Sequence, residues 1–402
     1  MSTALGVFLF ILTIIVMVMV HESGHYLAAR AFGMKIEEFF LGFGPRLVSW
    51  RRGETEYGVK AIMAGGYVKI AGMNPLQAAA ESEASRTLAA AVSEGAPAPA
   101  VPEPEEHRMF RSRPAWQRAI VLAAGSATHF VLAALILTFS FAVLGVVGSP
   151  TTVLHSVAAA SAARGGAPGP AQAAGLRPGD RIVAVDGTPV SSWDEIQKYI
   201  RARPGTTVAI EVRRDRRLLS FPVTPLQATD ANNQRIGLIG VAPEMSVRHE
   251  SLPVAAWSGV RGVGSLVVGS IGGLGAFLSP RGIGAVFSSV SHGRPASPAD
   301  QPIGLVGGAR LAAQAVQTGQ TQALVEILTA FIVFLGVLNL APLPPLDGGH
   351  LLMLAIEKVR GRPVDMRKVV PVAALVLSLL VTLSIAILYL DITNPIANPF
   401  PQ

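Results

Sequence analysis

The feature that most limits how this chain can fold is an apolar run near its start, residues 4–29, which reads ALGVFLFILTIIVMVMVHESGHYLAA. A helix of about 20 apolar residues crosses the ~30 Å hydrocarbon core of a bilayer, so this run is long enough to span a membrane. Ionisable side chains at that depth are costly and are rare where they have no function. His21, Glu22 and His25, all in the second half of the run, therefore need a functional explanation.

These three residues form the pattern H-E-x-x-H. On a helix, His21 and His25 lie on one face, one turn apart, and can bind a single metal ion. In zinc proteases with this pattern, two neutral imidazoles bind Zn²⁺ and the intervening carboxylate handles the proton of the bound water. The spacing thus predicts a zinc site with Glu22 as its catalytic base. Two alternatives remain open, a polar cluster that holds helices together and a site that transports a metal ion.

The composition is that of a membrane protein. Half of the residues (50%) are hydrophobic and 15% are charged, and the mean hydropathy of +0.46 is too high for an ordinary soluble enzyme. The chain has no cysteine, which excludes disulfides and thiolate ligands, so a metal must be held by nitrogen and oxygen. The net charge of +7 is spread over loops and predicts no nucleic-acid partner.

Hydropathy predicts about four membrane spans. They are residues 1–30, 114–148, 323–349 and 371–391. A further apolar stretch, 254–278, is rich in glycine and interrupted by Arg261. If it crossed the membrane, Asp347 would emerge on the face opposite the histidines, so we place it in an interfacial region, 248–322, on the outer side. Basic residues beside the first two spans and in the loop 350–370 are expected in the cytoplasm, which puts both termini, including the tail 392–402, outside.

Three segments between the spans have a different character. Residues 31–75 alternate aromatic and β-branched residues with glycine and predict a β region that dips toward the membrane. The segment 76–113, low in large apolar side chains, is expected to be a cytoplasmic linker. Residues 149–247 predict a soluble α+β domain with an Asp186-Gly187 hairpin and a helix opened by a capping box of Ser192 and Glu195. That pattern resembles a PDZ domain.

A third zinc ligand is expected from the segment that begins at Asn339 and reads NLAPLPPLDGGH. Its prolines, among them Pro342 and Pro344, break a helix where the bilayer would favour continuity, and such a break is tolerated where the backbone lines a protein cavity. Asp347 supplies a carboxylate there, which would complete a site of three ligands. The alternative is a simple turn that leaves the membrane.

Together, H-E-S-G-H, the segment from Asn339 to His350 and the PDZ-like insertion resemble the bacterial site-2 protease family, the intramembrane zinc metalloproteases. One PDZ-like domain is similar to the shorter actinobacterial members. The resemblance implies that His21, His25 and Asp347 bind zinc, that Glu22 is the general base and that Asn339 contacts the substrate backbone. It further implies a substrate-holding sheet, with these residues: Gly42, Phe43, Gly44, Gly66, Tyr67, Val68, Lys69 and Ile70.

One departure from the family concerns the second span. Many members carry Gly-Pro-x-x-Asn there, whereas this chain reads Gly125-Ser-Ala-Thr-His129. His129 either supports the zinc site by hydrogen bonding or packs between helices, and the sequence favours neither. Pro342 and Pro344 are further candidates for a supporting role beside the site. His350, one turn after Asp347, is expected to be an interfacial residue.

The resulting expectation is a polytopic α-helical membrane protein with a membrane-dipping β-sheet and an inserted extracytoplasmic PDZ-like α+β domain. By resemblance, it would be a zinc endopeptidase of the bacterial inner membrane that acts from the cytoplasmic side. Its substrates would be single-span membrane proteins, such as anti-sigma factors or signal-peptide remnants, after a prior cleavage of their ectodomains. The rival functions are a divalent-metal transporter and a non-catalytic PDZ scaffold.

Overall fold

The computed structural model describes residues 3–73, 106–157, 168–229, 234–293, 302–362 and 364–396. Most of the predicted linker 76–113 lies outside the described residues. The chain divides into two compact units. The first comprises Met1–Ala142 and Ser251–Gln402, the second Val143–Glu250, and each is described here by itself.

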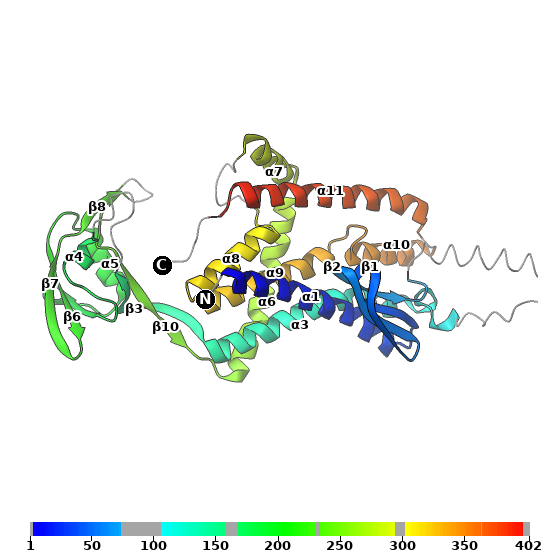
Figure 1. Ribbon diagram of the computed structural model, residues 1–402, viewed down its shortest axis with the longest axis horizontal. Coiled ribbons are helices and arrows are strands. Elements are labelled where there is room, and N and C mark those ends of the chain that lie inside the picture. The colour runs from blue at the N-terminus through cyan, green and yellow to red at the C-terminus, as the bar shows by residue number, and fades with distance from the viewer. Residues whose placement is uncertain are drawn as a thin grey trace, which may run out of the picture. The chain divides into compact units, whose positions relative to one another are not determined.

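Long apolar helices dominate the first unit (Figure 1). Among the described residues, five helices are long and apolar enough to cross a membrane. Such apolar runs form helices because a helix satisfies all of its backbone polar groups internally, which lipid cannot do. The five helices are α1 (Thr3–Ala31), α3 (Ala115–Phe139, continued by a π-helical turn Ser140–Leu144), α6 (Leu252–Phe277), α9 (Thr321–Asn339) and α11 (Met366–Thr393). The sequence predicts four spans, and the additional candidate is α6.

Helix α6 differs from the other four in direction. In Figure 1, the axes of α1, α3, α9 and α11 run in roughly the same direction, whereas the axis of α6 crosses that direction. It packs on α3, where Gly259 leaves no room for a Cβ against Thr138 and the carbonyl of Ala134. Its opposite side is apolar and exposed, with Trp257 and Val268 both about 70% accessible.

The core of the first unit lies where α1, α3 and α9 meet, and its buried members include Met17, Leu137 and Val333. Shorter helices complete the unit: α7 (Pro280–His292), α8 (Leu305–Gln317) and α10 (Asp347–Arg360). Helix α10 occupies half of the segment 350–370 that the sequence predicts as a loop. An aspartate in its first turn, basic residues in its last turn and Gly361 at its C-cap with φ +68° stabilise it.

The segment after α1 forms an antiparallel hairpin of β1 (Ile36–Arg52) and β2 (Thr55–Ile70) with several bulges. Two short 3₁₀ turns, Glu106–Arg108 and Phe110–Ser112, precede α3. Where the hairpin meets the helices, Ile36, Ile70 and Phe110 are buried in one cluster. The hairpin therefore packs firmly on the end of α1.

The second unit is an α+β domain around a six-stranded sheet in the order β10-β3-β4-β6-β7, with β5 beside β4. Its buried core includes Ile182, Ile196 and Ile210. As predicted, Asp186 and Gly187 form the β4–β5 turn with positive φ, and the Ser192 hydroxyl accepts the Glu195 N–H. The elements are β3 (Val146–Val157), α4 (Pro170–Ala173), β4 (Arg181–Val185), β5 (Thr188–Pro189), α5 (Trp193–Arg201), β6 (Val208–Arg214), β7 (Arg217–Val223), β8 (Leu226–Thr229), β9 (Arg235–Leu238) and β10 (Val241–Arg248), of which β8 and β9 pair separately.

Candidate metal centre

Helix α1 presents the two histidines of H-E-x-x-H on its buried side. His21 and His25 are 9% and 4% exposed, and their Nε2 atoms lie 3.2 Å apart. The Nδ1 of His25 lies 2.7 Å from the carbonyl oxygen of Val121 in α3. A carbonyl can only accept, so Nδ1 carries the hydrogen and the Nε2 lone pair is free to bind a metal.

Glycines let α3 approach this part of α1. A Cβ on Gly125 would overlap the imidazoles of both His21 and His25, and one on Gly24 would overlap the backbone of Ala124. Small residues at a crossing allow two membrane helices to pack closely. Gly24 and Gly125 were not predicted to have this role, although glycine inside an apolar span is a usable signal of close approach.

The third candidate ligand, Asp347, belongs to the proline-broken segment. Helix α9 ends at Asn339, and α10 begins at Asp347. Between them the chain folds back tightly, because Gly348 and Gly349 lie against the backbone of Leu340 and Leu343, where a Cβ would not fit. This turn places the Oδ2 atom of Asp347 3.3 Å from the Nε2 of His21 and 3.3 Å from the Nε2 of His25.

The three atoms fit a zinc ion. Ligand bonds of about 2.0–2.1 Å in a tetrahedron place neighbouring ligand atoms about 3.3 Å apart, which is the spacing observed here. Within the described part of the chain, His21, His25 and Asp347 form the one group of three or more potential metal-binding side chains. Asp347 Oδ2 is buried without a hydrogen-bond partner there, as expected of an atom reserved for a cation.

Glu22 lies beside the hairpin. A Cβ on Gly66 of β2 would be 3.2 Å from the Cγ of Glu22, and the backbone N–H of Val68 hydrogen-bonds to the Glu22 carboxylate. Because side chains alternate along a strand, Gly66, Val68 and Ile70 share the face toward α1. Ile70 is buried in the core beneath this face.

The other predicted substrate-binding residues make contacts within the hairpin. Tyr67 donates its hydroxyl hydrogen to Glu38 and accepts one from Lys60, and Lys69 pairs with Glu37 at 2.7 Å. The turn Gly42-Phe43-Gly44 has positive φ at both glycines, and the Phe43 ring stacks on Tyr67 with centroids 6.0 Å apart. The structure thus places Gly66 and Val68 beside Glu22, whereas the contacts of the other residues are within the hairpin.

Asn339, the last residue of α9, makes no side-chain hydrogen bond within the described residues, so its amide is available. Pro342 and Pro344 belong to the turn before Asp347, and the Pro344–Pro345 peptide is cis. The backbone N–H of His350 bonds to the carbonyl of Leu346, and its imidazole lies outside the group of three metal-binding side chains.

The His129 imidazole packs against the imidazole of His21. It is 2% exposed, its ring centroid is 5.1 Å from that of His21, and the two rings meet edge to face at 75°. The Nδ1 of His129 is 3.0 Å from the carbonyl oxygen of Ile332 in α9. Both the Nε2 of His129 and the Nδ1 of His21 are buried without a hydrogen-bond partner in the described residues.

Comparison with known proteins agrees with this chemistry. The sequence profile of peptidase family M50 matches residues 9–383. This chain belongs to peptidase family M50. It is similar to zinc metalloprotease Rip1 of Mycolicibacterium smegmatis, with 31% identity over 433 residues that cover 99% of each chain. To zinc metalloprotease Rip1 of Mycobacterium tuberculosis it is 30% identical over 425 residues, 97% of this chain and 98% of that one.

Membership of family M50 confirms the site-2 protease resemblance. The chain is a zinc metalloprotease with several apolar helices that identify it as a membrane protein. The rival functions, a metal transporter and a non-catalytic scaffold, are therefore set aside.

Proposed function

We propose that this M50 protease cleaves single-span membrane proteins at a peptide bond within or near the membrane. Zinc is held by His21, His25 and Asp347, with Glu22 as general base. The observation that carries the proposal is the tetrahedral spacing of the three ligand atoms beside Glu22, on a helix apolar enough to span a bilayer. A zinc ion bound there supplies a Lewis acid that makes water acidic enough to lose a proton near neutral pH.

The residues around the ion have separable tasks. Glu22 accepts the proton of the attacking water and passes it to the leaving amine. The free amide of Asn339 donates a hydrogen bond to the oxyanion that develops on the scissile carbonyl. The hydrogen bond from Val68 to Glu22 holds the base toward the strand side of the site.

An extended substrate segment is needed because a helix hides its peptide bonds. Strand β2 passes Glu22 at Gly66. Among the described residues it pairs only with β1, in a two-stranded sheet, so its other edge can take a further strand. Substrates are therefore expected to contain residues that weaken a helix within their span.

His129 is proposed as a positioning residue. Its Nδ1–H donates to Ile332, which leaves Nε2 as an acceptor, while a metal-bound His21 carries its hydrogen on Nδ1. An N–H···N bond between the two rings would satisfy both buried atoms and fix the orientation of His21.

The proposed topology has four spans, with the metal centre toward the cytoplasm and both termini and the second unit outside. The direction of α6, across the other long helices, supports its placement at the membrane interface (Figure 1). The second unit is proposed to be PDZ-like and to exclude proteins whose ectodomains are intact. The proposed substrates, such as anti-sigma factors or signal-peptide remnants, would be cut after a prior cleavage has removed their ectodomains.

The decisive test uses Glu22→Gln, which keeps the shape of the side chain but cannot accept the proton. Purified protein in lipid is given candidate single-span substrates, with and without a chelator. Zinc content should stay at one ion per chain, while cleavage falls by about 10²-fold or more. Near wild-type cleavage by Glu22→Gln would refute its role as base. Loss of zinc in His21→Ala and Asp347→Ala is the matched check on the ligands.

A further inference from the structure

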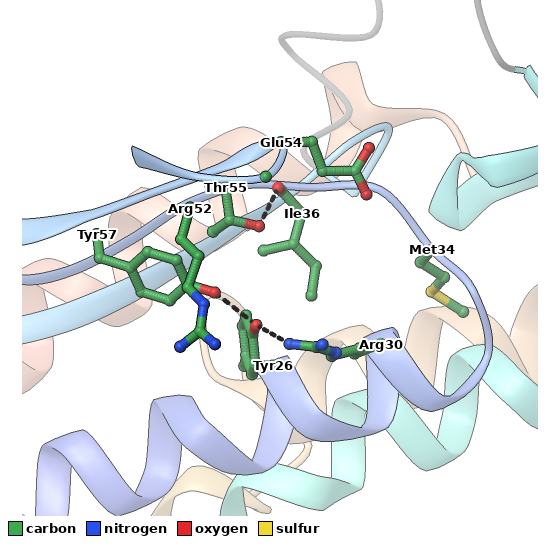
Figure 2. A pocket seen from close by; sticks show the side chains of 9 residues that line it. Tyr26, Arg30, Met34, Ile36, Arg52, Glu54, Thr55 and Tyr57 are labelled. Atoms are coloured by element: carbon green, nitrogen blue, oxygen red, sulfur yellow. Dashed lines mark hydrogen bonds between the residues drawn. The ribbon is translucent and has the colours of Figure 1, made fainter. Parts of the chain in front are cut away.

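A cavity of about 360 Å³ lies where the end of α1 meets the turn of the β1–β2 hairpin (Figure 2). Met34 and Ile36 give it an apolar wall, while Tyr26, Arg30, Arg52 and Tyr57 give it a polar one. None of the proposed zinc ligands lines it. The cavity is therefore distinct from the metal centre.

The polar wall contains a chain of hydrogen bonds. The Arg30 guanidinium donates to the Tyr26 hydroxyl at 2.8 Å, and the hydroxyl oxygens of Tyr26 and Tyr57 are 2.6 Å apart. One of the two hydroxyls donates to the other, so the hydrogen of the second hydroxyl is not used within the pair. That hydrogen is available to a ligand oxygen.

The charges of the cavity are unbalanced. In the described residues the Arg52 side chain has no hydrogen-bond or ion-pair partner, and Figure 2 shows its guanidinium beside Tyr26 and Tyr57. The one carboxylate of the lining, Glu54, is occupied by two N–H groups of Arg108. Two guanidinium groups and a hydroxyl donor thus face the cavity without a free carboxylate to neutralise them.

The position of the cavity identifies the source of an anion. Tyr26 and Arg30 belong to the last turns of α1, a helix apolar enough to span the membrane, so the cavity lies at the depth of lipid headgroups. Guanidinium groups bind phosphate oxygens in pairs of hydrogen bonds, and basic clusters next to a span attract anionic lipids. We propose that this cavity binds the phosphate group of an anionic phospholipid, with Arg30, Arg52 and Tyr57 as its donors.

The test measures binding of short-chain phosphatidylglycerol to the full-length, zinc-loaded protein in a neutral detergent. Phosphatidylcholine with the same chains is the comparison. We expect Arg52→Gln and Arg30→Gln each to weaken phosphatidylglycerol binding about tenfold, since each removes a charge-assisted contact. Tyr57→Phe should weaken it severalfold. Arg51→Gln is the matched control, because Arg51 is an exposed neighbour that does not line the cavity.

Three results would overturn the proposal. One is equal affinity of wild type and Arg52→Gln, a variant that leaves the Arg30–Tyr26–Tyr57 chain intact and so is decisive even if Arg30→Gln disturbs α1. Another is equal affinity for the anionic and zwitterionic lipids. The third is arginine-dependent binding of inorganic phosphate as tight as that of the lipid, which would assign the cavity to free phosphate.

Discussion

Gly125 of α3 occupies a point where any side chain would overlap the imidazoles of His21 and His25. Gly125→Ala should therefore push α3 from α1, lower stability by about 1–3 kcal/mol and weaken zinc binding. Thermal unfolding and zinc content of the purified variant check both effects. Gly264→Ala in α6 is the control, because a Cβ there meets no atom within 4 Å. Wild-type zinc affinity in Gly125→Ala would show that the helices can adjust at no cost.

His129 permits a sharper test at the same scale. Loss of a partner that orients a metal-binding histidine weakens zinc binding by about 10–100-fold. We expect this of His129→Ala, measured by competition with a chelator, and partial recovery in His129→Asn, whose carbonyl oxygen can accept the His21 N–H. If His129→Ala loses stability but keeps its zinc affinity, the residue only packs between helices.

The sequence could indicate the three candidate zinc ligands, which the structure places together, because their placement depends on local rules. His21 and His25 are one helical turn apart, and the prolines after Asn339 force the break that presents Asp347. The partner of His129 could not be read in the same way, since Ile332 lies on a different helix, and only packing brings its carbonyl to the imidazole.

At the scale of elements, side chains alternate between the two faces of β2, so the residues of the predicted substrate-binding strand fall into two groups. Gly66 and Val68 face Glu22, while Tyr67 and Lys69 bond within the hairpin. The resemblance implied that all residues of the strand from Gly66 to Ile70 hold substrate. A family motif identifies the strand but does not say which of its two faces points to the site. Helix α10 was missed for a related reason. Its basic residues are typical both of a cytoplasmic loop and of the last turn of a helix, so they did not distinguish the two.

The second unit offers a prediction about pH. Burial alone raises the pKa of Asp180, but two hydrogen bonds of 2.7 Å from Arg214 and one from the Arg177 N–H lower it, and the net pKa lies below its ordinary value. The folded state thus favours the carboxylate. This stabilisation is complete above the unfolded-state pKa of about 3.9 and is lost as the pH falls through the lowered folded-state pKa.

Hydrogen exchange of β4 and β6 in the intact protein measures this effect. Protection of the second unit should decline as the pH falls below about 4 in the wild type. In Asp180→Asn it should be lower at neutral pH and change less on acidification. Asp194→Asn, an exposed residue in the first turn of α5, is the control. An identical acid profile in wild type and Asp180→Asn would contradict the assignment.

At the scale of the whole molecule, α6 decides the topology, because its length and hydropathy alone would allow it to cross the membrane. In this cysteine-free chain, single cysteines at Ser246 and Ser288 lie before and after α6, and both positions are exposed. We expect an impermeant thiol reagent to label both from outside, and a cysteine at Ser49 of β1 only after the membrane is opened. Opposite accessibility of Ser246 and Ser288 would add a span and place Asp347 out of reach of the histidines.

The metal centre joins the first helix of the chain to a turn near its end. During synthesis, His21 and His25 enter the membrane early, whereas Asp347 is made only after α3, the whole second unit and the helices α6 to α9. At about 5–20 residues per second the interval is on the order of half a minute. Through that time the nascent chain holds two of the three proposed zinc ligands and cannot assemble the complete site. With this ligand set, the protease becomes active only after Asp347 has been made and inserted, so the growing chain cannot cut neighbouring membrane proteins before that point.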